Sequence, residues 1–328
     1  MNKKQWQFIL KYSASQAEGC GRAALPNRPG NGQFFGLPKR NAMHGFSLIE
    51  IAVVLIVISV LMVIVAAPLG SIRAQRATED TNAKLAALDA TIAVYVAQNG
   101  RLPCPANGTL DGTANANAGL EQINVGVTAC TLVNQTSGVV PWKTLGVQLA
   151  DVTDGWGNVF TYRVDESLIR AQAMNFTACS PGGTGAAMGG APNFTCAPCT
   201  SATFPAACTP PATVIAGRGI RVRDVGGTLL ADPAAAVSTG VAYVVISHGE
   251  NRNDSYSPQG VLQVGGTPAS GTEEARNAAN LPNTPAGTFY LVDSPAMYAD
   301  GVTHFDDIVL RRTILALASK AGLAPRAY

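Results

Sequence analysis

A long apolar stretch runs from Phe46 to Ala67, and its 22 residues include one charged side chain, Glu50. An α-helix of this length spans about 30 Å, the thickness of the hydrocarbon core of a bilayer. A cleaved secretory signal is the alternative, with Ala66 and Ala67 as small residues at the cleavage site, but the apolar region of such signals usually has about 7–15 residues. The pattern therefore predicts a transmembrane helix over residues 46–67.

Beyond Pro68 the apolar positions become periodic. They recur at spacings of three and four residues, which forms one apolar stripe on an amphipathic helix, at Leu85, Leu88, Ile92 and Tyr95. Charged residues are expected on its other faces, at Arg73, Arg76, Glu79, Asp80, Lys84 and Asp89. Asn99 and Gly100 are typical of a helix end. We expect one helix from about Phe46 to Gln98, whose amphipathic half, residues 68–99, packs against a globular head.

Residues 100–328 have the turn and strand signals of this head. A glycine-flanked turn at residues 154–158 precedes alternating apolar residues at Phe160, Tyr162 and Val164. The continuous apolar run Val241–Ser247 predicts a central strand that is buried on both faces. Shorter strands are expected within 219–225 and 288–292, and residues 305–316 fit either a strand or a short helix. The sequence thus predicts an α+β fold, with a long N-terminal helix packed on an antiparallel sheet.

Charge is distributed unevenly along the chain. Residues 1–45 have seven Lys or Arg and one acid, which leaves 16 basic and 20 acidic residues in the remainder. Basic residues before a membrane helix favour a cytoplasmic N-terminus and an exported head. A net charge of +2 excludes a strongly basic nucleic-acid-binding protein, and we expect no nucleic-acid partner. Arg218, Arg221 and Arg223 favour a solvated strand face over contact with DNA phosphates.

Six of the seven cysteines follow the apolar stretch, and only Cys20 precedes it. An even number of cysteines on the exported side of a membrane implies disulfides. Proximity in sequence favours a Cys104–Cys130 pair, which leaves four candidates in a long bridged loop at residues 176–217: Cys179, Cys196, Cys199 and Cys208. Cys196 and Cys199 also have the spacing of a metal or redox site, but this loop lacks the βαβ setting of a redox motif.

Polar clusters offer few candidates for chemistry. After the central strand, Glu250, Asn251, Asn253 and Asp254 suggest a calcium loop, but their spacing does not fit the twelve-residue calcium template and an ordinary turn is favoured. His304 beside Asp306 and Asp307 suggests a metal or acid–base pair, with a surface turn as the favoured alternative. The sequence has no hydrolase, metalloprotease, phosphate-loop or dinucleotide-binding motif. We expect neither an enzyme nor a bound cofactor.

The start of the apolar stretch has a recognisable motif, Gly45-Phe46-Ser47-Leu48-Ile49-Glu50, preceded by Lys39 and Arg40. It resembles the class III signal of type IV pilins and type II secretion pseudopilins. The resemblance implies that a prepilin peptidase removes a leader of residues 1–45 by cutting after Gly45 and then methylates Phe46. It also implies that Glu50 serves assembly. The leader is longer than is common in that family. The Trp-Gly-Asn turn at residues 156–158 resembles the head of the major pseudopilins.

The resemblance implies a minor pilin or pseudopilin, a structural subunit of a type IV pilus or type II secretion filament. Its partners would be the prepilin peptidase, other pilin subunits and the inner-membrane assembly platform. It would cross the bacterial cytoplasmic membrane once, with its head in the periplasm, before it enters a filament or reaches the cell surface. A single-pass, signal-anchored periplasmic binding domain or enzyme unrelated to pili is the alternative.

Overall fold

The computed structural model describes residues 46–179, 187–188, 194–195, 215–235, 239–264, 273–282, 290–294 and 305–324. Within these ranges it does not describe the side chains of residues 61, 63–71, 178, 179, 187, 188, 194 and 195. The chain divides after Val60 into two units. The helices are α2 (Leu48–Asn99), α3 (Trp142–Leu145) and α5 (Ile314–Lys320), with short 3-10 helices η1 (Val133–Gln135), η2 (Leu149–Val152), η3 (Glu166–Leu168), η4 (Phe176–Cys179) and η5 (Glu274–Asn277).

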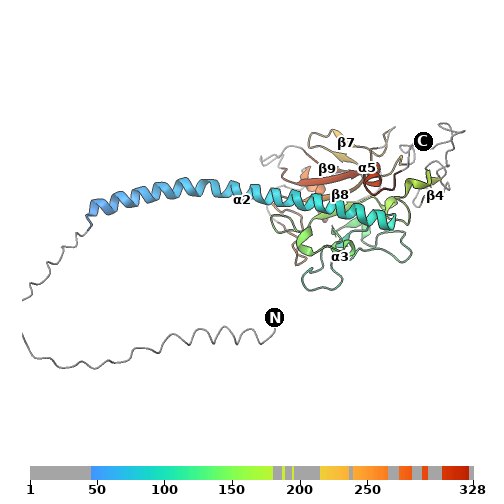
Figure 1. Cartoon of the computed structure of the whole chain (residues 1–328), viewed down its shortest axis with the longest axis horizontal. Coiled ribbons are helices and arrows are strands. Elements are labelled where there is room, and N and C mark those ends of the chain that lie inside the picture. Colours follow the sequence, from blue (N-terminus) through green and yellow to red (C-terminus); the bar gives the residue numbers. More distant parts are fainter. Residues whose placement is uncertain are drawn as a thin grey trace, which may run out of the picture. The chain divides into compact units, whose positions relative to one another are not determined.

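The second unit is built on a five-stranded antiparallel sheet in the order β1-β2-β3-β8-β10, of which Figure 1 labels β8. Its strands are β1 (Ala106–Asn107), β2 (Gly138–Val139), β3 (Thr161–Val164), β8 (Val241–Ser247) and β10 (Ile308–Thr313). A smaller sheet has the order β7-β6-β9, with β6 (Val222–Arg223), β7 (Leu229–Ala231) and β9 (Leu291–Val292), and its β6–β9 pair is parallel. β4 (Ala187–Met188) pairs with β5 (Phe194–Thr195). The fold is therefore α+β, as the sequence predicts.

Strand β8 is buried along its whole length because both of its faces are covered. On one face, Tyr243 and Val245 belong to the main core, which also contains Leu88 and Ile92 of α2. On the other face, Val244 and Ile246 pack in a second core with residues of the smaller sheet, including Val222 and Leu291. This arrangement confirms the central strand expected at Val241–Ser247.

The amphipathic part of α2 packs on the head mainly as its periodicity predicts. Leu85, Leu88 and Ile92 are buried. Asp89 differs from the prediction, because it is 2% exposed rather than on a solvated face. Its carboxylate accepts hydrogen bonds from Arg312 and Lys320, at 2.6 and 2.7 Å, and one from the Tyr243 hydroxyl. Asp89 lies on the buried stripe because these distant donors satisfy its charge.

The glycine-flanked turn also attaches α2 to the sheet. The Gly155 N–H donates to the Thr81 hydroxyl of α2 at 3.0 Å, and Lys84 donates to the Thr153 carbonyl at 2.8 Å. Asp154, in the same turn, accepts a hydrogen bond from Ser247 at the end of β8, at 2.7 Å. A Cβ at position 155 would lie 2.3 Å from the Ala77 carbonyl oxygen. Only glycine allows this approach of the turn to the helix backbone.

Two further expectations change in the structure. The prediction that Arg218, Arg221 and Arg223 form a solvated strand face is wrong. Arg218 is 1% exposed, and the Arg223 guanidinium stacks on the Tyr290 ring, 4.6 Å from its centroid. The C-terminal segment that fits either a strand or a helix forms both, as β10 followed directly by α5.

No helix in the described part of the chain combines the length and apolar character that a membrane span requires.

Candidate functional sites

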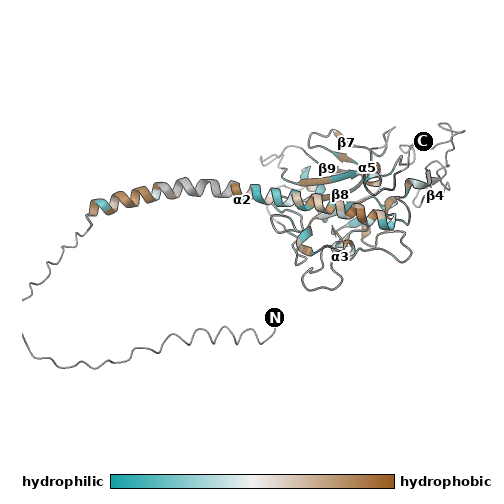
Figure 2. Ribbon diagram, viewed as in Figure 1, coloured by the Kyte–Doolittle hydropathy of each residue, from teal (hydrophilic) through white to brown (hydrophobic). Residues whose placement is uncertain are grey.

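The residues of the N-terminal motif lie at the start of α2. Gly45 is outside the described residues, while Phe46 precedes the helix and is 81% exposed. Glu50 is the acidic residue of the first helical turn and is also exposed. The side chains of residues 46–60 are all exposed, and most of them are apolar (Figure 2). This part of the helix thus presents a hydrophobic surface with one carboxylate near its N-terminal end.

The first turn of α2 has reciprocal hydrogen bonds between Ser47 and the helix start. The Ile49 N–H donates to the Ser47 hydroxyl at 3.3 Å, and the Ser47 N–H donates to Glu50 Oε2 at 3.1 Å. A Ser three residues before a Glu is the spacing of a capping box, and we use that name for these two bonds, although the Ser47 hydroxyl accepts the N–H of Ile49 rather than that of Glu50. The negative charge of Glu50 also lies at the positive end of the helix dipole, where it is stabilising. The structure therefore gives Glu50 a local partner within its own chain.

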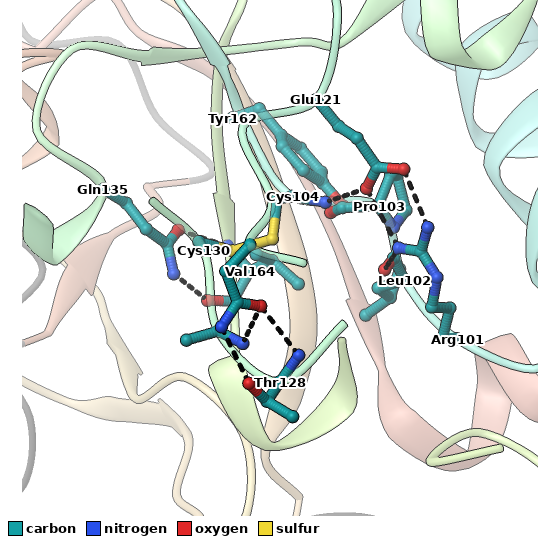
Figure 3. Close-up of a disulfide and its surroundings, with 12 residues drawn as sticks. Arg101, Leu102, Pro103, Cys104, Glu121, Thr128, Cys130, Gln135, Tyr162 and Val164 are labelled. Carbon is teal, nitrogen blue, oxygen red and sulfur yellow. Dashed lines mark hydrogen bonds and ion pairs between the residues drawn. A yellow bond between two sulfur atoms is a disulfide. The ribbon is translucent and has the colours of Figure 1, made fainter. Parts of the chain in front are cut away.

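Cys104 and Cys130 form a disulfide, the pairing expected from their proximity in sequence (Figure 3). Glu121 lies beside it, accepts the Cys104 N–H at 3.0 Å and binds both terminal nitrogens of Arg101 at 2.7 and 2.9 Å. The disulfide and this ion pair hold residues 101–130 against the core. Cys179 ends η4 without a described side chain, and Cys196, Cys199 and Cys208 lie outside the described residues. Their pairing therefore stays a prediction.

Three carboxylates gather in the head, from segments that are far apart in sequence. One oxygen each of Glu274, Asp306 and Asp307 lies within 4.8 Å of the others, so the group has the dimensions of a metal site. Glu274 is 4% exposed and Asp307 5% exposed. Glu274 Oε2 and Asp307 Oδ1 accept no hydrogen bond in the described structure. His248 Nδ1 lies 3.5 Å from Asp307 Oδ1.

Buried amides and an arginine position this cluster. Asn277 donates to Asp307 Oδ2 at 2.7 Å and exchanges two hydrogen bonds with the Val292 backbone. Arg163, buried on β3, donates to the carbonyls of Ala278, Ala279 and Leu281. These bonds hold the segment that contains Glu274 against both sheets.

The turn after β8, which the sequence marks as a calcium candidate, lies beside the cluster. The backbone N–H groups of Glu250 and Asn251 donate to Asp306 Oδ2 at 2.8 and 3.0 Å, and the Asn251 amide donates to Glu274 Oε1 at 2.6 Å. Asn253 donates its N–H to the Asn251 side chain. Asp254 is half-buried, and burial raises its pKa. His304 lies outside the described residues.

Burial and mutual repulsion oppose the simultaneous ionisation of all three carboxylates in the cluster. Burial raises the pKa of Glu274 to about 9, and the neighbouring charges of Asp307 and Asp306 act in the same direction. Like-charged carboxylates that share a buried site cannot all ionise unless a proton or a cation neutralises them. Three carboxylate groups are hard oxygen ligands of the kind that calcium takes.

Sequence reasoning identified part of these sites. The Ser47-x-x-Glu50 spacing is a readable signal for the capping box. Asp306 and Asp307 stand out in the sequence beside His304, whereas Glu274 does not, because it lies 32 residues before Asp306 and no local spacing marks it.

Comparison with curated proteins and with solved structures gives no significant match. One family model matches: residues 40–66 fit the prokaryotic N-terminal methylation motif. The matched segment contains Phe46, the capping box and the exposed apolar start of α2. The chain thus carries the signature motif of type IV pilins and pseudopilins at residues 40–66.

Proposed function

We propose that the chain is a minor pilin or pseudopilin, a structural subunit of a type IV pilus or type II secretion filament. The methylation motif at residues 40–66 is the observation that carries this proposal. The exposed apolar start of α2 supports it, because such a surface needs a lipid or protein environment. A role in assembly, rather than catalysis, is proposed for the chain.

The proposed organisation follows the sequence. Residues 1–45 form the leader, Phe46–Ala67 the membrane half of the helix, residues 68–99 its amphipathic half, and residues 100–328 the head. The span of 22 residues with one charge supports insertion into the cytoplasmic membrane, with the head in the periplasm. Prepilin peptidase, other pilin subunits and the inner-membrane assembly platform are the proposed partners. The head of about 230 residues favours a minor or tip subunit over the repeated one.

Glu50 has a defined part in the proposed assembly. A carboxylate in hydrocarbon costs at least about 2.5 kcal/mol, and an ion pair reduces this cost. After cleavage behind Gly45, the new amine of Phe46 in a neighbouring subunit would supply the positive partner. The carboxylate is one helical turn from the chain end, so it can reach the end of an adjacent helix.

The experiment is the mass of the N-terminal peptide of the full chain, extracted from membranes with and without co-expressed prepilin peptidase. We expect a peptide that starts at N-methyl-Phe46 only when the peptidase is present. A Glu50→Ala variant should still be cleaved but should not enter filaments. An intact leader under both conditions, or a cut after Ala67, would contradict the proposal and favour the signal-anchored alternative.

A second candidate function is the binding of a divalent cation in the head. The buried oxygens of Glu274 and Asp307 that accept no hydrogen bond favour it, because ionised carboxylates this close need a positive partner. Calcium fits the all-oxygen donor set best. Such an ion would connect η5 to the segment before β10 and stabilise the head.

Calcium titration of the full chain in detergent tests this second candidate. We expect the melting temperature of wild type to rise with calcium, and the rise to be absent in Glu274→Gln, which keeps the shape but not the charge. Glu166→Gln, a carboxylate outside the cluster, is the matched control and should respond as wild type does. An unchanged wild-type melting temperature in millimolar calcium would mean that the cluster holds a proton instead.

A further inference from the structure

Two arginines lie on one face of α2, between the apolar segment Phe46–Ala67 and the part of the helix that packs on the head. Arg73 and Arg76 are three residues apart, a spacing that places both on the same side of a helix. Both side chains are exposed. Among the residues that the structure describes, neither guanidinium donates a hydrogen bond or forms an ion pair. This stretch of α2 therefore presents two positive charges that no described side chain neutralises.

The acids nearest to these arginines along the helix have other partners. Asp80 lies one turn after Arg76, a spacing at which the two side chains could pair. Its carboxylate instead pairs with Lys84, at 2.7 Å. Glu79 accepts a hydrogen bond from Gln75, at 3.3 Å. The positive charge of the arginines is thus available to a partner from outside the chain.

The position of the two arginines along α2 indicates which partner this is. They follow Ala67, the end of the apolar segment, by six and nine residues, which corresponds to about 9 and 14 Å along a helix. The head groups of a bilayer occupy about 5–8 Å on each side of its hydrocarbon core. Helix side chains tilt toward the N-terminus, and long arginine side chains extend toward a membrane surface. Both guanidinium groups therefore come within reach of the lipid phosphates when residues 46–67 span the membrane.

The head leaves this site accessible. The turn at residues 153–155 approaches α2 at Ala77 and binds Thr81, both beyond the two arginines. A guanidinium is planar, stays charged and can bind a phosphate group through two parallel hydrogen bonds. Basic residues beside a membrane helix are attracted most strongly by lipids with a net negative charge. The chemistry and the position of the pair therefore favour an anionic phospholipid.

We propose that Arg73 and Arg76 form a docking site for the phosphate groups of anionic phospholipids on the outer surface of the cytoplasmic membrane. This inference rests on the proposed function, because it requires the apolar segment to span that membrane. It adds a lipid partner, which holds the start of the head at the membrane until the subunit enters a filament. Transfer into a filament then includes the release of these lipids.

Native mass spectrometry of the full chain tests the proposal, in detergent with equal amounts of phosphatidylglycerol and phosphatidylcholine that have the same acyl chains. The readout is the ratio of retained phosphatidylglycerol to retained phosphatidylcholine. We expect Arg73→Gln and Arg76→Gln each to lower this ratio about fivefold, the contribution of one basic residue near an anionic surface. The basic leader also attracts anionic lipids, but it is the same in wild type and variants, so their difference reports on residues 73 and 76.

Arg252→Gln is the matched control, because it removes one positive charge from an exposed arginine in the turn after β8. It should give the wild-type ratio. The double variant Arg73→Lys/Arg76→Lys keeps both charges and should keep most of the preference. A wild-type ratio in both glutamine variants of α2, or an equal loss in Arg252→Gln, would overturn the docking site and leave the proposed function intact. Failure of the proposed function shows separately, as the absence of a peptide that starts at N-methyl-Phe46.

Discussion

Asp89 shows how one residue decides the packing of α2 on the head. It lies between Leu88 and Ile92 on the buried side of the helix, where an isolated charge would be costly. Arg312 and Lys320 bring positive charge to it from β10 and α5, and the Tyr243 hydroxyl comes from β8. One carboxylate therefore connects the helix, the central strand and the C-terminal segment.

The Asp89→Asn substitution should destabilise the head. Asparagine keeps the size of the side chain but removes the charge that Arg312 and Lys320 bind, and charged hydrogen bonds of this kind contribute about 2–3 kcal/mol in total when one partner is partly solvated. Unfolding in urea, followed by tryptophan fluorescence of the full chain in detergent, measures the loss. Asp80→Asn is the control, because Asp80 is exposed and its ion pair with Lys84 joins two residues of the same helix. Equal stability of the two variants would contradict the role of Asp89.

Acid should weaken this interaction over a defined pH range. Burial alone would raise the pKa of Asp89, but hydrogen bonds from Arg312, Lys320 and Tyr243 outweigh it and lower the pKa to about 2. A lowered pKa in the folded state gives stability that is complete above the ordinary value of 3.8 and is lost as the pH falls to about 2. Between pH 4 and pH 2, wild type should therefore lose more stability than Asp89→Asn does. Parallel pH profiles of the two melting temperatures would contradict this assignment.

At the scale of elements, the sequence predicts those whose residues act locally. The apolar run of β8 and the stripe of α2 both appear where expected, because burial follows the strand and helix periods directly. The sites depend on distant contacts instead. The partners of Asp89 are more than 150 residues away, and Glu274 joins Asp307 across 33 positions. No local pattern contains such pairings, so the sequence places Asp89 on the wrong face of the helix and does not reveal Glu274.

The contact between the glycine turn and α2 gives a prediction at this scale. Gly155→Ala would place a methyl group against the backbone of Ala77, and this overpacking should cost about 1–3 kcal/mol. Gly226→Ala is the control, because its Cβ would meet only the Asp224 side chain at 3.4 Å. Thermal unfolding of the two variants measures the difference. A Gly155→Ala variant as stable as Gly226→Ala would show that the turn does not approach the helix this closely.

At the scale of the whole molecule, the disulfide between Cys104 and Cys130 restricts the unfolded chain. Closing a loop with a sequence separation of 26 should contribute about 3–4 kcal/mol by the loop-entropy model. The double variant Cys104→Ser/Cys130→Ser should melt at a lower temperature than wild type, and dithiothreitol should lower the wild-type value further than that of the variant. Equal responses to dithiothreitol would mean that this disulfide does not stabilise the head.

The bonds between α2 and the head also have a mechanical consequence. Thr81, Lys84 and Asp89 attach successive turns of the helix to the 153–155 turn and to Arg312 and Lys320. A pull along the helix axis therefore loads these bonds side by side, in shear, rather than one after another. Through Asp154 and Ser247 the same tension passes into β8, an interior strand of the sheet, and through Arg312 it passes into β10 at the edge of the sheet. Load from the helix is thus shared between an interior strand and an edge strand of the sheet.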